Sequence, residues 1–169
     1  GIVERYRGVI SVASEPGKGT RFDVIFPVTD RDNRPVDTAA EEDFSGRERV
    51  LFVDDEPMLV DLGRTILTKQ GYRVTGMTDP REALAVFRKA PDRFDIVITD
   101  LTMPGLPGDR LAESIAAVRP DVPILLCSGY VQHGNHPCLA GTIHKPLHLQ
   151  ALSRAVREAL DQGRPSSHR

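Results

Sequence analysis

The chain has 169 residues, of which 40% are hydrophobic, enough for one domain with a sizeable core and some additional segments. Its 22 basic and 24 acidic residues nearly cancel, which argues against an electrostatic nucleic-acid binder. No apolar run approaches the roughly 20 residues of a membrane helix, so we expect no membrane contact. The two cysteines, Cys127 and Cys138, suit a reducing cytoplasm better than a disulfide-stapled secreted protein.

The first 28 residues predict a β-hairpin. Two runs, 8–14 and 20–26, alternate apolar and polar residues, and the segment 15–19 between them is rich in turn-forming residues. A lone hairpin is only marginally stable in water, so we expect it to pack on something else. Because the chain opens on Gly1 and a short helical remnant, we expect it to be a fragment of a larger protein.

Residues 29–48 predict a flexible acidic linker. They hold seven acidic and three basic residues, with only Val36 and Phe44 as sizeable apolar side chains. Such a composition buries too little apolar surface to fold alone. A short disordered tail is expected at 163–169, because Gly163 and Pro165 stop the preceding helix.

Between the linker and the tail, short apolar runs alternate with amphipathic stretches. Strands are expected at 50–53, 72–75, 94–99, 123–127 and 141–144. Helices are expected from 57 to 70, from 79 to about 89, around 111–118 and around 149–160. This alternation predicts an α/β fold, a doubly wound parallel sheet of five strands with helices on both faces.

Polar residues follow the predicted strands at the points where they end. Asp54 and Asp55 follow the first strand, Asp100 the third, Ser128 the fourth and Lys145 the fifth. Because parallel strands share one carboxyl-terminal edge, these side chains are expected to converge there. Crowded carboxylates favour a hard cation such as Mg²⁺, and a carboxylate beside a metal and a lysine can attack phosphorus to give an aspartyl phosphate.

Residues 49–162 resemble the receiver domain of bacterial two-component response regulators. The resemblance rests on four motifs in order: Val-Leu-Phe-Val-Asp54-Asp55-Glu56-Pro57, Asp95-Ile-Val-Ile-Thr-Asp100-Leu-Thr-Met103-Pro104-Gly105, Ile-Leu-Leu-Cys-Ser128-Gly-Tyr and Lys145-Pro146. It implies a flavodoxin-like sheet with strand order 2-1-3-4-5. It also implies phosphoryl transfer from a histidine kinase or a histidine phosphotransfer protein; the oligomeric state stays open.

The same resemblance assigns roles to residues of this edge. Asp100 would be the phosphoacceptor, Lys145 would sense the phosphate, and Ser128 would be the switch hydroxyl. Mg²⁺ would bind Asp55 directly and Asp54 through water, and Asp100 would also belong to the metal site.

The Thr102 backbone carbonyl would complete that metal site. The loop residues 103–105 and 107–108 would shape it.

Residues 8–28 also resemble the end of a histidine-kinase ATP-binding domain, through Gly17-Lys18-Gly19-Thr20 and the hairpin around it. The other kinase motifs, including the Asp-x-Gly-x-Gly nucleotide motif and the phosphodonor histidine, are not found in this chain. We therefore expect the chain alone neither to bind ATP nor to autophosphorylate. A kinase end at 1–28, a linker at 29–48 and a receiver at 49–162 imply a hybrid histidine kinase as the parent.

The chain departs from the receiver pattern in two places. Thr142 stands where the family usually has an aromatic switch residue, three positions before Lys145. The stretch between Ser128 and Lys145 is shorter than usual and rich in glycine and proline, which disfavour a helix. Phosphorylation is still expected, but the usual conformational switch would be absent or would use another side chain such as Tyr130.

Other interpretations of the same residues stay open. The receiver-like fold could be an interaction module that is never phosphorylated. A phosphatase of the haloacid dehalogenase type would need a second acid where Thr102 stands. His133, His136 and Cys138 could bind Zn²⁺, although a solvated loop is the simpler interpretation. Cys127 is expected to be a core residue rather than a nucleophile.

Overall fold

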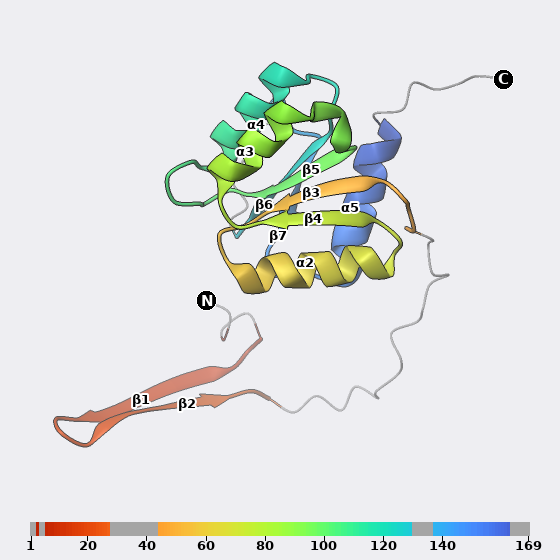
Figure 1. The fold of residues 1–169 in the computed structure, drawn as a ribbon. Coiled ribbons are helices and arrows are strands. Elements are labelled where there is room, and N and C mark those ends of the chain that lie inside the picture. The colour runs from red at the N-terminus through yellow and green to blue at the C-terminus, as the bar shows by residue number, and fades with distance from the viewer. Residues whose placement is uncertain (1–2, 4–5, 28–43, 130–136, 163–169) are drawn as a thin grey trace. The chain divides into compact units, whose positions relative to one another are not determined.

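The computed structural model describes residues 3, 6–27, 44–129 and 137–162 (Figure 1). The chain divides into two compact units, Gly1–Glu42 and Asp43–Arg169. Each unit is considered by itself.

The first unit contains the predicted hairpin. Strand β1 (Val9–Glu15) pairs antiparallel with β2 (Gly19–Ile25), and Glu15 lies opposite Gly19 at the turn. Gly17 and Gly19 have φ values of 78° and 95°, a left-handed conformation that favours glycine. The prediction of a hairpin is therefore confirmed.

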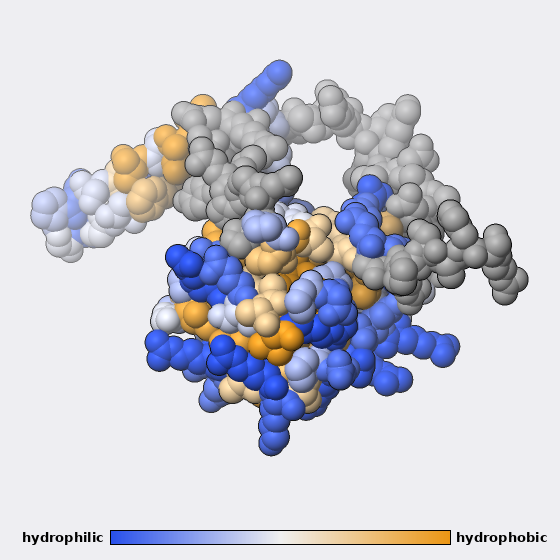
Figure 2. All heavy atoms as spheres, turned by 90° about the horizontal axis from the view of Figure 1, so that it is seen from above, coloured by the Kyte–Doolittle hydropathy of each residue, from blue (hydrophilic) through white to orange (hydrophobic). Residues whose placement is uncertain are grey.

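One face of this hairpin is apolar and open. Its side chains form the cross-strand pairs Ile10–Val24 and Val12–Phe22, and each is between 47% and 65% exposed. Figure 2 shows apolar side chains as orange spheres on the surface of the elongated hairpin. Two strands have no interior of their own, so alternation sorts side chains onto two faces without burying either.

The second unit is a five-stranded parallel sheet in the order β4-β3-β5-β6-β7. Its strands are β3 (Arg49–Val53), β4 (Arg73–Met77), β5 (Ile96–Asp100), β6 (Ile124–Ser128) and β7 (Gly141–His144). Its helices are α2 (Pro57–Lys69), α3 (Pro80–Lys89), α4 (Gly108–Val118) and α5 (Leu149–Gln162). Counted within this unit the strand order is 2-1-3-4-5, so the predicted fold is confirmed.

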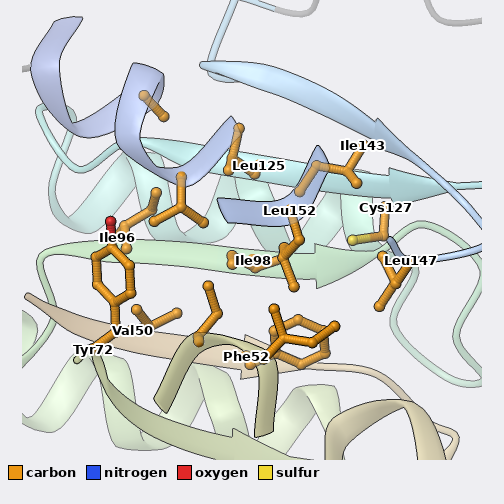
Figure 3. Packing of buried hydrophobic residues seen from close by; sticks show 14 of the residues in the cluster. Val50, Phe52, Tyr72, Ile96, Ile98, Leu125, Cys127, Ile143, Leu147 and Leu152 are labelled. Carbon is orange, nitrogen blue, oxygen red and sulfur yellow. The ribbon is translucent and has the colours of Figure 1, made fainter. Parts of the chain in front are cut away.

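Helices cover both faces of this sheet (Figure 1). Helices α2 and α5 pack on the face to which Val50 and Phe52 of β3 point, and Figure 3 shows this part of the core. Helices α3 and α4 pack on the opposite face, to which Leu51 and Val53 point. Each of these four β3 side chains therefore meets one of two apolar cores, as expected of a strand buried on both faces.

Local sequence signals fix several helix ends. The Asp79 carboxylate accepts hydrogen bonds from the backbone N–H groups of Arg81 and Glu82, at 2.7 and 3.2 Å, and so caps α3. Gly71, with φ of 94°, follows the end of α2. A short 3₁₀ turn, η1 (Pro91–Arg93), precedes β5, which begins two residues later than predicted.

Residues 44–48, which composition assigns to the linker, belong to the second unit and pack against the rest of it. The backbone N–H of Gly46 donates to the Gln70 carbonyl at 2.9 Å, and the Tyr72 hydroxyl donates to the Phe44 carbonyl at 2.8 Å. Residues 44–48 are hereafter called the strap. Its contacts are with residues far along the chain, so local composition could not indicate them. The rest of the predicted linker and the tail at 163–169 lie outside the described residues.

Candidate functional site

The site lies at the carboxyl-terminal edge of the parallel sheet. Asp54 follows β3, Asp100 ends β5, Ser128 ends β6 and Lys145 follows β7. The structure brings Asp54, Asp100 and Lys145 into direct contact, although Asp54 and Lys145 are 91 positions apart in the sequence. Parallel pairing of β3, β5, β6 and β7 is what places these residues together.

Lys145 bridges two buried carboxylates. Its Nζ lies 2.8 Å from Asp54 Oδ2 and 2.6 Å from Asp100 Oδ1. The side chains of Asp54 and Asp100 are only 1% and 7% exposed, against 21% for Lys145. Two negative charges therefore share one positive charge in a site that is largely closed to water.

The backbone supplies donors to the other carboxylate oxygens. Asp54 Oδ1 accepts a hydrogen bond from the Glu56 N–H at 3.0 Å, and Asp100 Oδ2 accepts one from the Thr102 N–H at 2.8 Å. These bonds, together with those to Lys145, fix the rotation of both carboxylates.

The electrostatic balance keeps the lysine charged. Burial alone would lower the pKa of Lys145, but its hydrogen bonds to Asp100 and Asp54 outweigh burial and raise the pKa to about 12. Burial raises the pKa of Asp54, even though the Lys145 ammonium opposes it. The site thus holds a permanent cation beside carboxylates that are short of compensating charge.

Asp55 and Ser128 lie at the same edge. Asp55 is half-buried beside Asp54, and Ser128 is 2% exposed at the end of β6. The Lys145 N–H donates to the Ser128 carbonyl at 2.9 Å, so the ends of β6 and β7 are joined. The structure thus places Asp55 and Ser128 at the edge where sequence reasoning expected them.

The donor set of this edge fits Mg²⁺. Among the described residues, no three His, Cys, Asp or Glu side chains are gathered as a complete protein-only metal site would require. Mg²⁺ does not need such a cage, because it is usually held by one or two carboxylates and keeps several waters. The carboxylates of Asp54, Asp55 and Asp100 and the main-chain carbonyl of Thr102 offer only hard oxygen atoms.

The loop after β5 folds back on the end of that strand. The Leu101 N–H donates to the Cys127 carbonyl and the Gly108 N–H donates to the Leu101 carbonyl, both at 2.9 Å. Sequence reasoning missed one contact of this loop: Arg81 of α3 donates to the Gly105 carbonyl at 3.3 Å. The two residues are 24 positions apart, and no spacing rule connects them.

Cys127 is a core residue, as predicted. It is 1% exposed on β6, and burial raises the pKa of its thiol to about 12, so the reactive thiolate is disfavoured. Cys138 is partly buried against the core that contains α3 and α4. Thr142 is exposed on β7, while Tyr130, His133 and His136 lie outside the described residues.

The five-stranded parallel sheet carries buried carboxylates and one lysine in contact at its carboxyl-terminal edge. This combination is typical of α/β domains that accept a phosphoryl group on an aspartate. Residues 50–157 match the response regulator receiver domain, and the chain belongs to this family. Among solved structures, the chemotaxis response regulator CheY4 of Vibrio cholerae has a TM-score of 0.61 at 26% identity and covers 68% of this chain and 99% of its own.

Two curated relatives are much longer than this chain. The sensor kinase CckA of Brucella abortus is 32% identical over 176 residues, covering 96% of this chain and 19% of that protein. The receiver domain of a hybrid histidine kinase CckA has a TM-score of 0.59 at 28% identity and covers 66% of this chain and 98% of its own. The putative two-component response regulator ARR21 of Arabidopsis thaliana is 30% identical over 118 residues, 68% of this chain and 19% of its own.

The chain therefore spans about a fifth of the length of these two curated relatives. Across the part that the structure describes, no helix has the length and apolar character needed to cross a membrane.

Proposed function

We propose that Asp100 is the phosphoacceptor of this receiver domain. It would take a phosphoryl group from a phosphohistidine of a histidine kinase or of a histidine phosphotransfer protein. The observation that carries the proposal is the buried Asp100 carboxylate, held 2.6 Å from a permanent ammonium at the end of β5. One carboxylate oxygen attacks phosphorus, and an O–P bond forms as the N–P bond breaks. The imidazole leaves with the electron pair of that bond.

The other side chains of the edge stabilise the transferring group. The Lys145 ammonium neutralises charge on the phosphoryl oxygens, and the Thr102 N–H holds the carboxylate in one orientation. Ser128, at the end of the neighbouring strand, would donate a hydrogen bond from its hydroxyl to a phosphoryl oxygen once the product forms.

Mg²⁺ is the cofactor that this donor set favours. Asp54, Asp55, Asp100 and the Thr102 carbonyl would hold it, and the ion would neutralise negative charge at the acceptor when bound. Without it, Lys145 is the cation in contact with Asp54 and Asp100.

We infer that the receiver belongs to a hybrid histidine kinase that acts in the cytoplasm. The similarity to a sensor kinase extends over 96% of this chain and so reaches beyond the receiver into the hairpin segment. This supports the interpretation of residues 1–28 as the end of a kinase ATP-binding domain and of 49–162 as its receiver. The two cysteines are free thiols, in keeping with a reducing compartment.

The test is covalent labelling followed by intact mass. The chain is incubated with Mg²⁺ and acetyl phosphate, beside the Asp100→Asn variant and the control Asp121→Asn, whose side chain is solvent-exposed. The parent and the control should gain one phosphoryl group that mild base removes, and Asp100→Asn should gain none.

Full labelling of Asp100→Asn would show that the acceptor is another residue. If no variant is labelled while the fold stays intact, the interaction-module alternative would replace phosphoryl transfer as the leading function.

A further inference from the structure

Helix α4 begins unusually close to the main chain of Asp100. Its first residue, Gly108, is buried, and a Cβ built there would lie 1.9 Å from the Asp100 carbonyl oxygen and 2.8 Å from its carbonyl carbon. Real Cβ atoms essentially never approach other heavy atoms within 3.0 Å. The helix can therefore start at this point only because residue 108 has no side chain.

The main chain of Leu101, the residue after Asp100, is held from two sides. On one side the Leu101 N–H donates to the Cys127 carbonyl of β6, and on the other the Leu101 carbonyl accepts from the Gly108 N–H. One residue further on, the Thr102 N–H holds Asp100 Oδ2 at 2.8 Å. A shift of the Asp100 carbonyl would therefore carry the carboxylate away from Lys145 and Thr102 together.

Among the described residues, the other glycines of this unit do not approach the main chain of Asp100 in this way. A Cβ at Gly63 would meet the ring of Phe52 at 2.6 Å, so it would disturb the core and not the acceptor backbone. A Cβ at Gly105, in the same loop as Thr102, would meet only the Arg81 side chain at 3.4 Å, although its φ of 77° makes any side chain unfavourable there. Gly63 therefore separates core damage from displacement of the acceptor.

We propose that Gly108 is a positioning residue for phosphoryl transfer: its missing side chain lets α4 fix the main chain of Asp100, and through it the carboxylate. The inference rests on the proposed function, because it takes Asp100 as the acceptor. Reactions that depend on orientation are sensitive to small displacements, and about 1 Å can cost on the order of 100-fold in rate.

The experiment compares Gly108→Ala with the parent chain and with Gly63→Ala. Labelling by acetyl phosphate and Mg²⁺ is followed by intact mass, and the folded fraction of each variant is measured under the same conditions, with sucrose added where needed to favour the folded state. We expect Gly108→Ala to label about 100-fold more slowly than the parent at equal folded fraction. Gly63→Ala should be less stable but should label at close to the parental rate.

A second readout does not depend on activity. Hydrogen exchange of the Thr102 N–H reports its bond to Asp100 Oδ2, and it should become faster in Gly108→Ala but not in Gly63→Ala.

The proposal is overturned if Gly108→Ala labels and exchanges like the parent, or if Gly63→Ala is slowed equally. It is also overturned if Gly108→Ala does not fold even in sucrose, because the whole domain would then need the glycine. Failure of the proposed function is recognised separately, since the parent chain itself would not be labelled.

Discussion

The two ends of the parallel sheet differ in how their carboxylates are paired with positively charged side chains. At the amino-terminal end, each of two carboxylates is bound by a separate guanidinium: Asp95 pairs with Arg49 at 2.7 Å, and Glu48 of the strap pairs with Arg157 of α5 at 3.0 Å. Arg157 also contacts the exposed carboxylate of Asp161 at 3.0 Å. At the carboxyl-terminal end, two carboxylates that are more deeply buried share the single ammonium of Lys145.

The pKa values follow this difference. Hydrogen bonds from Arg49 lower the pKa of Asp95. Burial would raise the pKa of Glu48, but backbone and Arg157 hydrogen bonds outweigh it and the pKa is lowered. Burial raises the pKa of Asp54 at the other end. The same type of side chain therefore stabilises the fold at one end, and at the other leaves a deficit of positive charge that a divalent cation could fill.

The strongest test of this comparison removes the shared cation. Lys145→Met should lower the free energy of unfolding by about 3 kcal/mol at neutral pH without Mg²⁺, because Asp54 and Asp100 would be buried without a positive partner. Urea unfolding in the presence of a chelator measures this change.

The matched control is Lys69→Met, at the exposed end of α2, which should change stability by a few tenths of a kcal/mol. Added Mg²⁺ should restore part of the stability of Lys145→Met, since an ion that binds only the folded state stabilises it. An unchanged unfolding free energy for Lys145→Met would remove the basis of the comparison.

A smaller effect is expected from the same substitution made at both ends. Asp95→Asn should lower the free energy of unfolding by about 1 kcal/mol, because it breaks a charge-assisted bond to a partly exposed arginine. Asp54→Asn should leave the unfolding free energy unchanged or raise it, because the buried ammonium of Lys145 keeps Asp100 as its partner. Equal losses at the two positions, measured by urea unfolding at pH 7, would contradict the contrast.

The smallest effect is expected in the way the free energy of unfolding changes with pH in acid. Glu48 and Asp95 have folded-state pKa values below their ordinary values of 4.5 and 3.8. Their contribution to the free energy of unfolding is therefore complete when the pH is above their ordinary pKa values. It is lost as the pH falls through the lower pKa values of the folded state. We expect the free energy of unfolding to decline below about pH 5, and Asp95→Asn to make this decline shallower by less than about 1 kcal/mol. If the free energy of unfolding declined equally steeply in Asp95→Asn and in the parent, the pKa of Asp95 in the parent would not be lowered.

Much of the site could be predicted because parallel strands obey a general rule. Asp100 and Lys145 are far apart in the sequence, yet each follows or ends a strand, and such positions meet at one edge of a parallel sheet. The sequence thus indicated which residues meet. It could not indicate that Lys145 would bridge two carboxylates, because that depends on side-chain placement.

The strap shows that local sequence patterns do not predict contacts between distant parts of the chain. Residues 29–48 are acidic and poor in apolar residues, which is typical of a linker, and only the fold brings Glu48 to Arg157, 109 positions later. The Gly108 contact was hidden for a similar reason, because it depends on how closely α4 approaches β5. Alternation in the hairpin correctly predicted β1 and β2, but period-two patterns do not reveal whether a face is covered.

The strap also bears on where this molecule can be cut. The family match covers 50–157, but a piece with those limits would lose Arg49, the guanidinium partner of Asp95, and Phe44, whose carbonyl accepts the Tyr72 hydroxyl. It would also lose the last turn of α5, including the buried Leu160. The stretch by which the domain is recognised is therefore shorter than the stretch that makes these contacts, and we expect a stable piece to need residues 44–162.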